Sequence, residues 1–263
     1  MSKSVDPGTA TLIAAVIGAA ATVGGVVVGR WSQPTLLRPP IRDMIIFVTG
    51  ASSAGKTALA HELARRTGIR CVIPLDMLRR SLRGVPEVAA EHPELAQTSF
   101  LAHETLQQKL GRPVSVREGI QLQSTVVWPT LREAMDKARD KDLGAIFEGS
   151  NILPSLVFGD GGASGQAGSR LALISLHIGS DATHLERLRS RQQQGAYGLT
   201  PLEFDNKYID NLALIRKANQ MYYEEAREIQ KEFPGANIFV VDNERKLRAT
   251  AAEIARRVRQ CAR

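Results

Sequence analysis

The chain has 263 residues, 43% of them hydrophobic, and a formal net charge of +7. This length and apolar content exclude a disordered polypeptide and suit one α/β domain with an additional segment. The two cysteines, Cys71 and Cys261, show no metal-ligand or disulfide-scaffold spacing, so a reducing cytosol is compatible. The positive charge suits an anionic ligand or an anionic membrane surface, or equally a set of solvated helix faces.

The N-terminal segment carries no charged residue from position 7 to position 29. About 20 helical residues span roughly 30 Å, which is the thickness of a bilayer core. Arg30 and Trp31 follow directly, and a charge beside an amphipathic ring is typical of the headgroup zone. We therefore expect residues 1–30 to form a single-pass membrane anchor that contacts lipid through residues 8–29. A cleaved signal peptide or a buried helix is the alternative.

Residues 31–43 contain three prolines and form the expected linker to a folded domain over residues 44–263. The basic residues beside the apolar segment predict its orientation. Three arginines follow the segment and one lysine precedes it: Arg30, Arg38, Arg42 and Lys3. Because cytoplasmic flanks carry the excess of basic residues, we expect the folded domain to lie in the cytoplasm.

Residues 44–49 form a short apolar run that predicts a buried strand. The next eight residues fit the phosphate-binding motif G-x-x-x-x-G-K-[ST] at every fixed position: Gly50, Ala51, Ser52, Ser53, Ala54, Gly55, Lys56 and Thr57. Residues 58–66 then predict a helix, which Gly68 can end. The motif requires this context of strand, loop and helix, which disfavours a plain turn with an exposed lysine.

The chemistry of this loop predicts ATP and Mg²⁺ as cofactors. Gly50 permits a tight turn that a Cβ atom would obstruct. Backbone N–H groups of the loop and the positive end of the following helix can then hold phosphate oxygens. We expect Lys56 to bridge the β- and γ-phosphates and Thr57 to give its hydroxyl to Mg²⁺.

A second strand is predicted over residues 69–74, and it runs directly into a helix over residues 75–83. Open α/β sheets bind ligands at the carboxyl ends of their strands, so Asp76 is expected beside the phosphate loop. Arg79 and Arg83 are four residues apart and share one helix face. These residues predict a substrate site; the alternative is a capping aspartate followed by a solvated basic helix.

The middle of the chain predicts helices over residues 92–110 and 116–141, the second with a kink or a break at Pro129. Residues 143–147 predict a third strand that ends at Glu148. A carboxylate at this place can support the Mg²⁺ ion or orient a substrate. A strand-terminal glutamate in an ordinary turn is the alternative.

Residues 159–169 are rich in glycine and predict a surface insertion before a fourth strand over residues 171–178. A basic helix then begins at His184, and it places Arg187 and Arg191 one turn apart. Arginines on such a segment could close over the γ-phosphate as a lid. A solvated basic face is the alternative.

The last part of the chain predicts a largely helical stretch over residues 201–230, a fifth strand over residues 237–241 and a final helix over residues 247–258. The arginines of the final helix lie mostly off its apolar stripe. We therefore expect no nucleic-acid partner.

In this order, the motifs resemble those of archaeal-type 2-phosphoglycerate kinases, P-loop kinases related to nucleoside monophosphate kinases and zeta-toxin-like kinases. The resemblance extends from residue 44 to residue 245. It departs from the family pattern at Asn151, where a histidine is expected, and at Leu75, where a small hydroxyl residue is expected. The matching residues are 50–57, Asp76, Leu78, Arg79, Arg83, 99–101, 118–120, 147–149, Pro154, His184, Arg187, Leu188, Arg191, Ile215 and Arg216.

The resemblance implies a P-loop NTPase fold, a three-layer α/β sandwich around a five-stranded parallel sheet. It also implies transfer of the γ-phosphoryl group of ATP to a hydroxyl of a small acidic acceptor such as 2-phosphoglycerate. In that reaction Asp76 would accept the hydroxyl proton or orient the hydroxyl. Arg79 and Arg83 would bind the acidic group of the acceptor, and Glu148 would support the metal or the substrate.

The same resemblance implies roles for three basic residues around the transferred group. Lys56 would hold the phosphates, and Arg187 and Arg191 would neutralise charge in the transition state, where one well-placed arginine can contribute about 10³–10⁵ in rate.

Two functions of other classes remain open. In a membrane-tethered ATPase switch, hydrolysis would drive a conformational change; such proteins usually hold Mg²⁺ with an aspartate at a strand end, where this chain has Glu148. The second alternative function is a membrane-tethered module that binds nucleotide without catalysing a reaction. The intact pair of Lys56 and Thr57, together with Asp76, argues against it.

Overall fold

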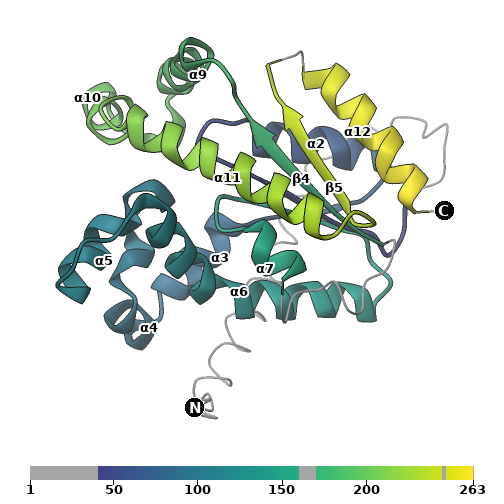
Figure 1. Ribbon diagram of the computed structural model, residues 1–263, viewed down its shortest axis with the longest axis horizontal. Coiled ribbons are helices and arrows are strands. Elements are labelled where there is room, and N and C mark those ends of the chain that lie inside the picture. The colour runs from purple at the N-terminus through teal and green to yellow at the C-terminus, as the bar shows by residue number, and fades with distance from the viewer. Residues whose placement is uncertain (1–40, 160–169, 245–246, 263) are drawn as a thin grey trace.

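The computed structural model describes residues 41–159, 170–244 and 247–262 (Figure 1). The expected membrane anchor of residues 1–30, most of the linker and nearly all of the glycine-rich insertion lie outside these ranges. Across the three described ranges, no helix combines the length and the apolar character needed to cross a bilayer.

The centre of the fold is a parallel sheet in the order β2-β3-β1-β4-β5. Each expected strand is present, with small shifts at the ends. The five strands are β1 (Ile45–Gly50), β2 (Cys71–Pro74), β3 (Ala145–Glu148), β4 (Leu171–His177) and β5 (Asn237–Asp242). Because the strands are parallel and Glu148 pairs with both Val48 and Pro74, the carboxyl ends of β1, β2 and β3 meet at one edge.

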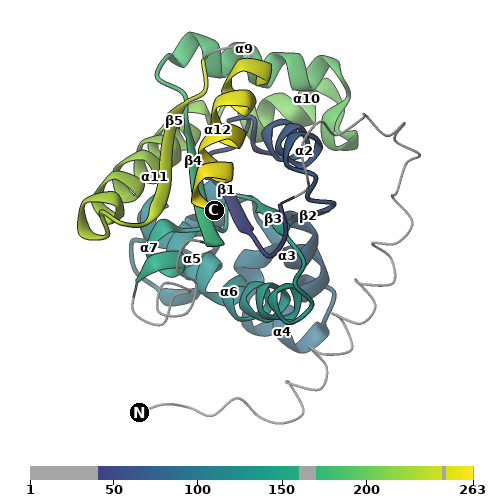
Figure 2. The same ribbon diagram turned by 90° about the vertical axis from the view of Figure 1, so that its right-hand side faces the viewer.

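Two helices cover one face of the sheet: α2 (Lys56–Thr67) and α12 (Leu247–Cys261). Their apolar side chains, such as Leu59 of α2 and Val258 of α12, form one core with alternate residues of the strands, such as Ile46 of β1. Figure 2 shows the two helices together on the same side of the strands. The glycine Gly68 ends α2 with a left-handed φ of +79°, as the sequence predicts.

The opposite face is covered by four helices: α3 (Leu75–Arg83), α6 (Val116–Asp140), α7 (Pro154–Phe158) and α11 (Leu212–Glu232). A second core joins them to the other side chains of the strands, among them Phe47, Phe147 and Val127. Helices therefore lie on both faces of the sheet, and the predicted three-layer α/β architecture is confirmed (Figure 2).

The predicted helix over residues 92–110 is wrong in its first half. The structure has a short helix α4 (Pro86–Glu91), two 3₁₀ turns, η1 (Pro93–Ala96) and η2 (Ser99–Leu101), and then α5 (Ala102–Leu110). Gln97 and Thr98 are extended and separate the two turns. The reason is tertiary, because the carbonyl of Gln97 accepts hydrogen bonds from distant side chains instead of from a following helical turn.

Helix α6 continues through Pro129, so the predicted break is absent there. Proline removes one backbone donor and leaves the carbonyl of Thr125 without its usual intrahelical partner. Pro129 and Thr125 are both exposed, so this carbonyl lies on the solvent side of the helix.

The helical segment between β4 and β5 is more divided than the sequence suggests. It contains α9 (Asp181–Gln193), a 3₁₀ turn η4 (Ala196–Gly198), α10 (Pro201–Phe204), a π-helical turn η5 (Asp205–Ile209) and α11. Thr200 and Glu203 form a capping box at the start of α10. Helices α9 and α10 lie beyond the carboxyl ends of the strands, on the side of the phosphate loop (Figure 1).

Candidate active site

The phosphate loop has a backbone that requires glycine at both glycine positions of the motif. Gly50 has a φ of +141° and Gly55 a φ of +94°, conformations that side chains with a Cβ rarely adopt. A Cβ on Gly50 would lie 2.6 Å from the carbonyl oxygen of Leu176, and one on Gly55 would lie 2.7 Å from Asn243 Nδ2. Both glycines therefore allow the loop to pass close to its neighbours.

Protein donors bind the carbonyl groups of this loop. His184 Nε2 lies 2.7 Å from the carbonyl oxygen of Ser52, and Asn243 Nδ2 donates to that of Ala54 at 2.8 Å. Lys56 Nζ donates to the carbonyl of Ala51 at 2.7 Å. The contacts from His184 and Asn243 fix the loop from outside, and that from Lys56 fixes it from within, which suits a preorganised cradle whose N–H groups hold phosphate.

Lys56 is the point at which the predicted charged residues meet. Burial lowers the pKa of the Lys56 ammonium; the charges of Glu148 and Asp76 oppose this shift, and the charge of Arg191 adds to it. These three residues come from β3, α3 and α9, far apart in the sequence. The structure therefore brings three predicted site residues within electrostatic range of Lys56.

The two residues expected to bind Mg²⁺, Thr57 and Glu148, contact each other. Thr57 Oγ1 donates to Glu148 Oε1 at 3.0 Å, and Glu148 is only 6% exposed at the end of β3. A hydroxyl and one carboxylate are hard oxygen ligands of the kind that Mg²⁺ uses together with substrate phosphates and water. No group of three or more His, Cys, Asp or Glu suited to a metal occurs in the described part of the chain, so the ion would depend on the nucleotide for its other ligands.

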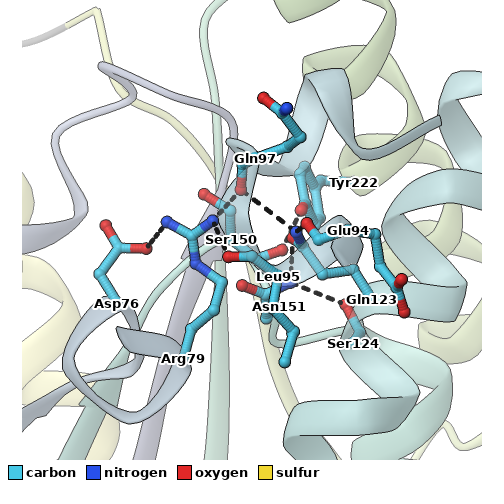
Figure 3. A network of polar contacts seen from close by, with 10 residues as sticks. All are labelled: Asp76, Arg79, Glu94, Leu95, Gln97, Gln123, Ser124, Ser150, Asn151 and Tyr222. Carbon is cyan, nitrogen blue, oxygen red and sulfur yellow. Dashed lines mark hydrogen bonds and ion pairs between the residues drawn. The ribbon is translucent and has the colours of Figure 1, made fainter. Parts of the chain in front are cut away.

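Asp76 lies in the first turn of α3, and its side chain is 61% exposed. The N-cap position is Pro74, so Asp76 is not the capping residue of the alternative interpretation. Arg79 Nη2 lies 3.2 Å from Asp76 Oδ1, while Arg79 Nη1 donates to the carbonyl of Gln97 (Figure 3). Arg83 is exposed on the same helix, and its side chain forms no hydrogen bond or ion pair with any described residue.

Two of the three arginines of α9, Arg187 and Arg191, contact the phosphate loop. Arg187 Nη1 donates to the carbonyl of Ala54 at 3.3 Å and Nη2 donates to that of Asn243; burial lowers the pKa of this guanidinium. Arg191 Nη1 lies 3.4 Å from Ser53 Oγ. The structure thus places these residues beside the predicted phosphate site.

His184 has a role that the sequence did not predict, although its spacing from Arg187 singled it out. The side chain is fully buried, and burial lowers the pKa of its imidazole to about 4. A neutral ring that donates from Nε2 to Ser52 can accept at Nδ1, which lies 3.5 Å from Arg216 Nη1. Arg216 also forms a 2.6 Å ion pair with Asp181, so the loop is braced from α9 and α11.

Three tyrosines near Asp76 were missed entirely. The negative charge of Asp76 contributes to raising the pKa of Tyr197, Tyr208 and Tyr222, although burial is the main cause for each. The rings of Tyr197 and Tyr208 are stacked at 5.2 Å, and Arg191 lies 4.7 Å above the Tyr197 ring. These residues come from η4, η5 and α11, and no sequence motif connects them.

Comparison with known proteins gives a consistent set of relatives. No protein-family model matches the chain. It is 27% identical over 191 residues to a protein named 2-phosphoglycerate kinase from Methanococcus maripaludis, an alignment that covers 71% of this chain and 57% of the relative. A protein of that name from Methanothermobacter thermautotrophicus is 26% identical over 189 residues, which cover 70% of this chain and 58% of the relative. A third, from Pyrococcus horikoshii, is 32% identical over 129 residues, which cover 48% of this chain and 40% of the relative.

Solved structures of small-molecule kinases also align with this chain, at low scores. A gluconokinase from Sinorhizobium meliloti is 18% identical with a TM-score of 0.42, covering 85% of this chain and 93% of its own. A deoxyadenosine kinase from M. mycoides with bound dATP is 14% identical with a TM-score of 0.45, covering 82% and 99%. The predicted resemblance is thus confirmed at the level of sequence: the chain is similar to archaeal 2-phosphoglycerate kinases and spans about 57% of the length of the first of them.

Proposed function

We propose that this chain transfers the γ-phosphoryl group of ATP to a hydroxyl of a small anionic acceptor, with 2-phosphoglycerate as the first candidate. The observation that carries the proposal is the convergence at Lys56 of an acceptor-side carboxylate, a metal-side carboxylate and an arginine. The charges of Glu148 and Asp76 raise the pKa of Lys56, and the charge of Arg191 lowers it. Glu148 also accepts from Thr57 Oγ1 at 3.0 Å, and Arg191 Nη1 lies 3.4 Å from Ser53 Oγ of the same loop. A plain nucleotide-binding module has no need for the exposed carboxylate of Asp76 in this place.

The residues would divide the work as follows. The loop and Lys56 would hold the phosphates, and Thr57 with Glu148 would hold Mg²⁺, which supplies positive charge at the phosphates when bound. Arg187 and Arg191 would neutralise the charge that develops on the transferred group. In phosphoryl transfer the protein contributes mainly positioning and electrostatic stabilisation, which matches a site built from fixed charges.

The acceptor would lie between Asp76 and the phosphate loop. Asp76 would accept the proton of the attacking hydroxyl or orient that hydroxyl. Arg83 offers an exposed guanidinium on the same helix for the acidic group of the acceptor, whereas the guanidinium of Arg79 already contacts protein groups. The similarity to proteins named 2-phosphoglycerate kinase supports an acidic acceptor.

We also propose that residues 8–29 tether this domain to a membrane with the domain on the cytoplasmic side, where ATP is available. The support is the uncharged composition of residues 7–29 and the arginines that follow it.

The test is an assay of ATP consumption by the full chain with Mg²⁺ and a panel of hydroxyl acceptors that includes 2-phosphoglycerate, 3-phosphoglycerate and glycerate. We expect ADP formation to depend on one anionic acceptor and a phosphorylated product to appear by mass spectrometry. ATP turnover that no acceptor stimulates would point to the switch-type ATPase instead.

Lys56→Ala is the first control. Removal of one preorganised electrostatic contact typically costs about 10²–10³ in rate. We expect transfer to fall by this factor, while thermal unfolding stays close to that of the wild type because the lysine is not part of any of the three apolar cores. A variant with ordinary activity would remove the loop from the mechanism.

A further inference from the structure

A polar network connects Asp76 to the interior of the protein (Figure 3). Arg79 bridges the Asp76 carboxylate and the carbonyl of Gln97, and a weaker contact of 3.5 Å joins it to the carbonyl of Leu95. The Arg79 side chain is only 12% exposed, against 61% for Asp76. The carboxylate expected to meet the acceptor is therefore held from the protein side by an arginine that is almost enclosed.

Gln123 of α6 forms the centre of this network. It is fully buried, and its Nε2 donates to the carbonyls of Glu94 at 2.6 Å and Gln97 at 3.2 Å. Its Oε1 accepts from Asn151 Nδ2 at 2.9 Å. The carbonyl of Gln97 thus accepts from both Gln123 and Arg79, so a change at either side chain is transmitted to the other.

The far end of the network is the loop that follows Glu148. Asn151 is 2% exposed, and its Nδ2 also lies 3.5 Å from Ser124 Oγ. Tyr222 of α11 donates to the carbonyl of Ser150 (Figure 3). The segment that leaves the metal-side carboxylate is therefore fixed by the same group of buried side chains.

We propose that Arg79, Gln123 and Asn151 form a positioning unit that fixes Asp76 relative to Glu148, and that Arg79 does not bind the acceptor. This inference rests on the proposed phosphoryl transfer. Nη1 of Arg79 contacts the carbonyls of Gln97 and Leu95, Nη2 contacts the Asp76 carboxylate, and Nε is buried without a hydrogen-bond partner. Four of the five N–H groups therefore contact protein or are buried, and the side chain, only 12% exposed, has one N–H of Nη2 left for a solvent-borne acceptor. The planar guanidinium contacts the carbonyl and the carboxylate from two separate nitrogens in a fixed geometry, whereas lysine offers a single nitrogen on a flexible stem, so lysine is a poor substitute.

A kinetic comparison separates the positioning role from direct binding. Arg79→Lys and Gln123→Met should each lower kcat with 2-phosphoglycerate by about 10²-fold, because misplacement of a reacting group by about 1 Å has that effect. The KM for the acceptor should stay nearly constant, since positioning acts in the transition state. The matched controls are Arg80→Lys and Gln121→Met, neighbours on the same helices that lie outside the network.

The double variant adds a second criterion. If Arg79 and Gln123 act through the same carbonyl, their effects should not add. The double variant Arg79→Lys with Gln123→Met should then be as active as the less active of the two single variants. A raised acceptor KM in Arg79→Lys with unchanged kcat would make Arg79 an acceptor ligand and overturn the proposal. So would a Gln123→Met protein as active as its Gln121→Met control. If Gln123→Met does not fold, the isosteric Gln123→Glu takes its place.

One measurement does not depend on activity. Nitrogen-15 spectra of the Arg79 guanidinium in the wild-type chain should show separate, slowly exchanging Nη signals, and these should average in the Gln123 variant. If the wild type phosphorylates no acceptor, the proposed function fails, yet this measurement still tests the network. Averaged Arg79 signals in the wild type would overturn the positioning unit whatever the assay shows.

Discussion

Asp76 is the residue at which the proposed reaction can be tested most directly. Asp76→Asn keeps the size of the side chain but removes the charge and the ability to take a proton. We expect ATP affinity to stay close to that of the wild type and transfer to be lost, because the change acts on the acceptor side. Equal losses in ATP affinity and transfer would instead place Asp76 on the nucleotide side. Binding calorimetry with an ATP analogue and a transfer assay measure the two quantities.

His184 should make the stability of the fold depend on pH. Burial lowers the pKa of His184 to about 4, while an unfolded chain has a histidine pKa near 6.5. Between these values the unfolded state binds a proton that the folded state excludes, so the free energy of unfolding falls as pH drops from about 6.5 towards 4. The full effect amounts to about 3 kcal/mol.

Denaturant unfolding at pH 7 and pH 4.5 checks this expectation. His184→Gln can still donate to the Ser52 carbonyl but does not titrate, so it should lose less stability on acidification than the wild type. Exposed His61, changed to Gln, serves as the control and should follow the wild type. Parallel losses in all three proteins would assign the acid sensitivity to other groups.

At the scale of elements, the β1–loop–α2 unit offers a test of backbone geometry. Gly50→Ala places a methyl group 2.6 Å from a backbone oxygen at a φ of +141°, so the loop must shift. Gly111→Ala at a φ of +65° has no atom within 4 Å and should cost only the left-handed backbone penalty, about 1–2 kcal/mol. We expect Gly50→Ala to destabilise more and to weaken ATP binding, whereas Gly111→Ala should leave ATP binding unchanged. Similar effects of both on ATP binding would contradict this.

The elements that the sequence predicted correctly are those whose determinants are local. A β-prone apolar run, a glycine loop and a helix ended by Gly68 follow one another within 25 residues of chain, from 44 to 68. The helix expected from residue 92 failed because Gln97 is bound by Gln123, 26 positions away. Helix α6 continues past Pro129 because water can donate to the exposed carbonyl of Thr125, which lacks its intrahelical partner.

In the candidate active site, too, the residues that the sequence could predict are those with local determinants. Lys56, Thr57 and Asp76 could be placed from a motif and from the rule that ligands bind at strand ends. The tyrosines around Asp76 could not, because their proximity depends on how η4, η5 and α11 fold back over the sheet edge. The hydrogen bond from Arg79 to the Gln97 carbonyl could not be predicted either, because the sequence of a basic helix face does not indicate which distant carbonyl its arginine will contact.

For the whole molecule, the open question is attachment to a membrane. The expected anchor lies outside the described residues, and its uncharged run from residue 7 to residue 29 is long enough to span a bilayer core. The full chain should therefore stay with the membrane fraction after a high-salt wash and after carbonate extraction. A peripheral protein held by its net positive charge would be released by salt, because surface electrostatics are screened.

A charge in the middle of the segment gives the sharper experiment. An arginine at the centre of a membrane helix costs about 2.5–3.5 kcal/mol on insertion scales, and this segment has only modest hydrophobicity because alanine and glycine are frequent in it. Ile17→Arg should thus move the chain into the supernatant, whereas the matched Ile17→Leu should remain with membranes. The phosphoryl-transfer rate should be the same for both, since the tether and the sheet edge that carries Asp76 are separate parts of the chain. Wild-type protein found in the supernatant after a salt wash would end the proposal of a membrane anchor and leave the kinase proposal intact.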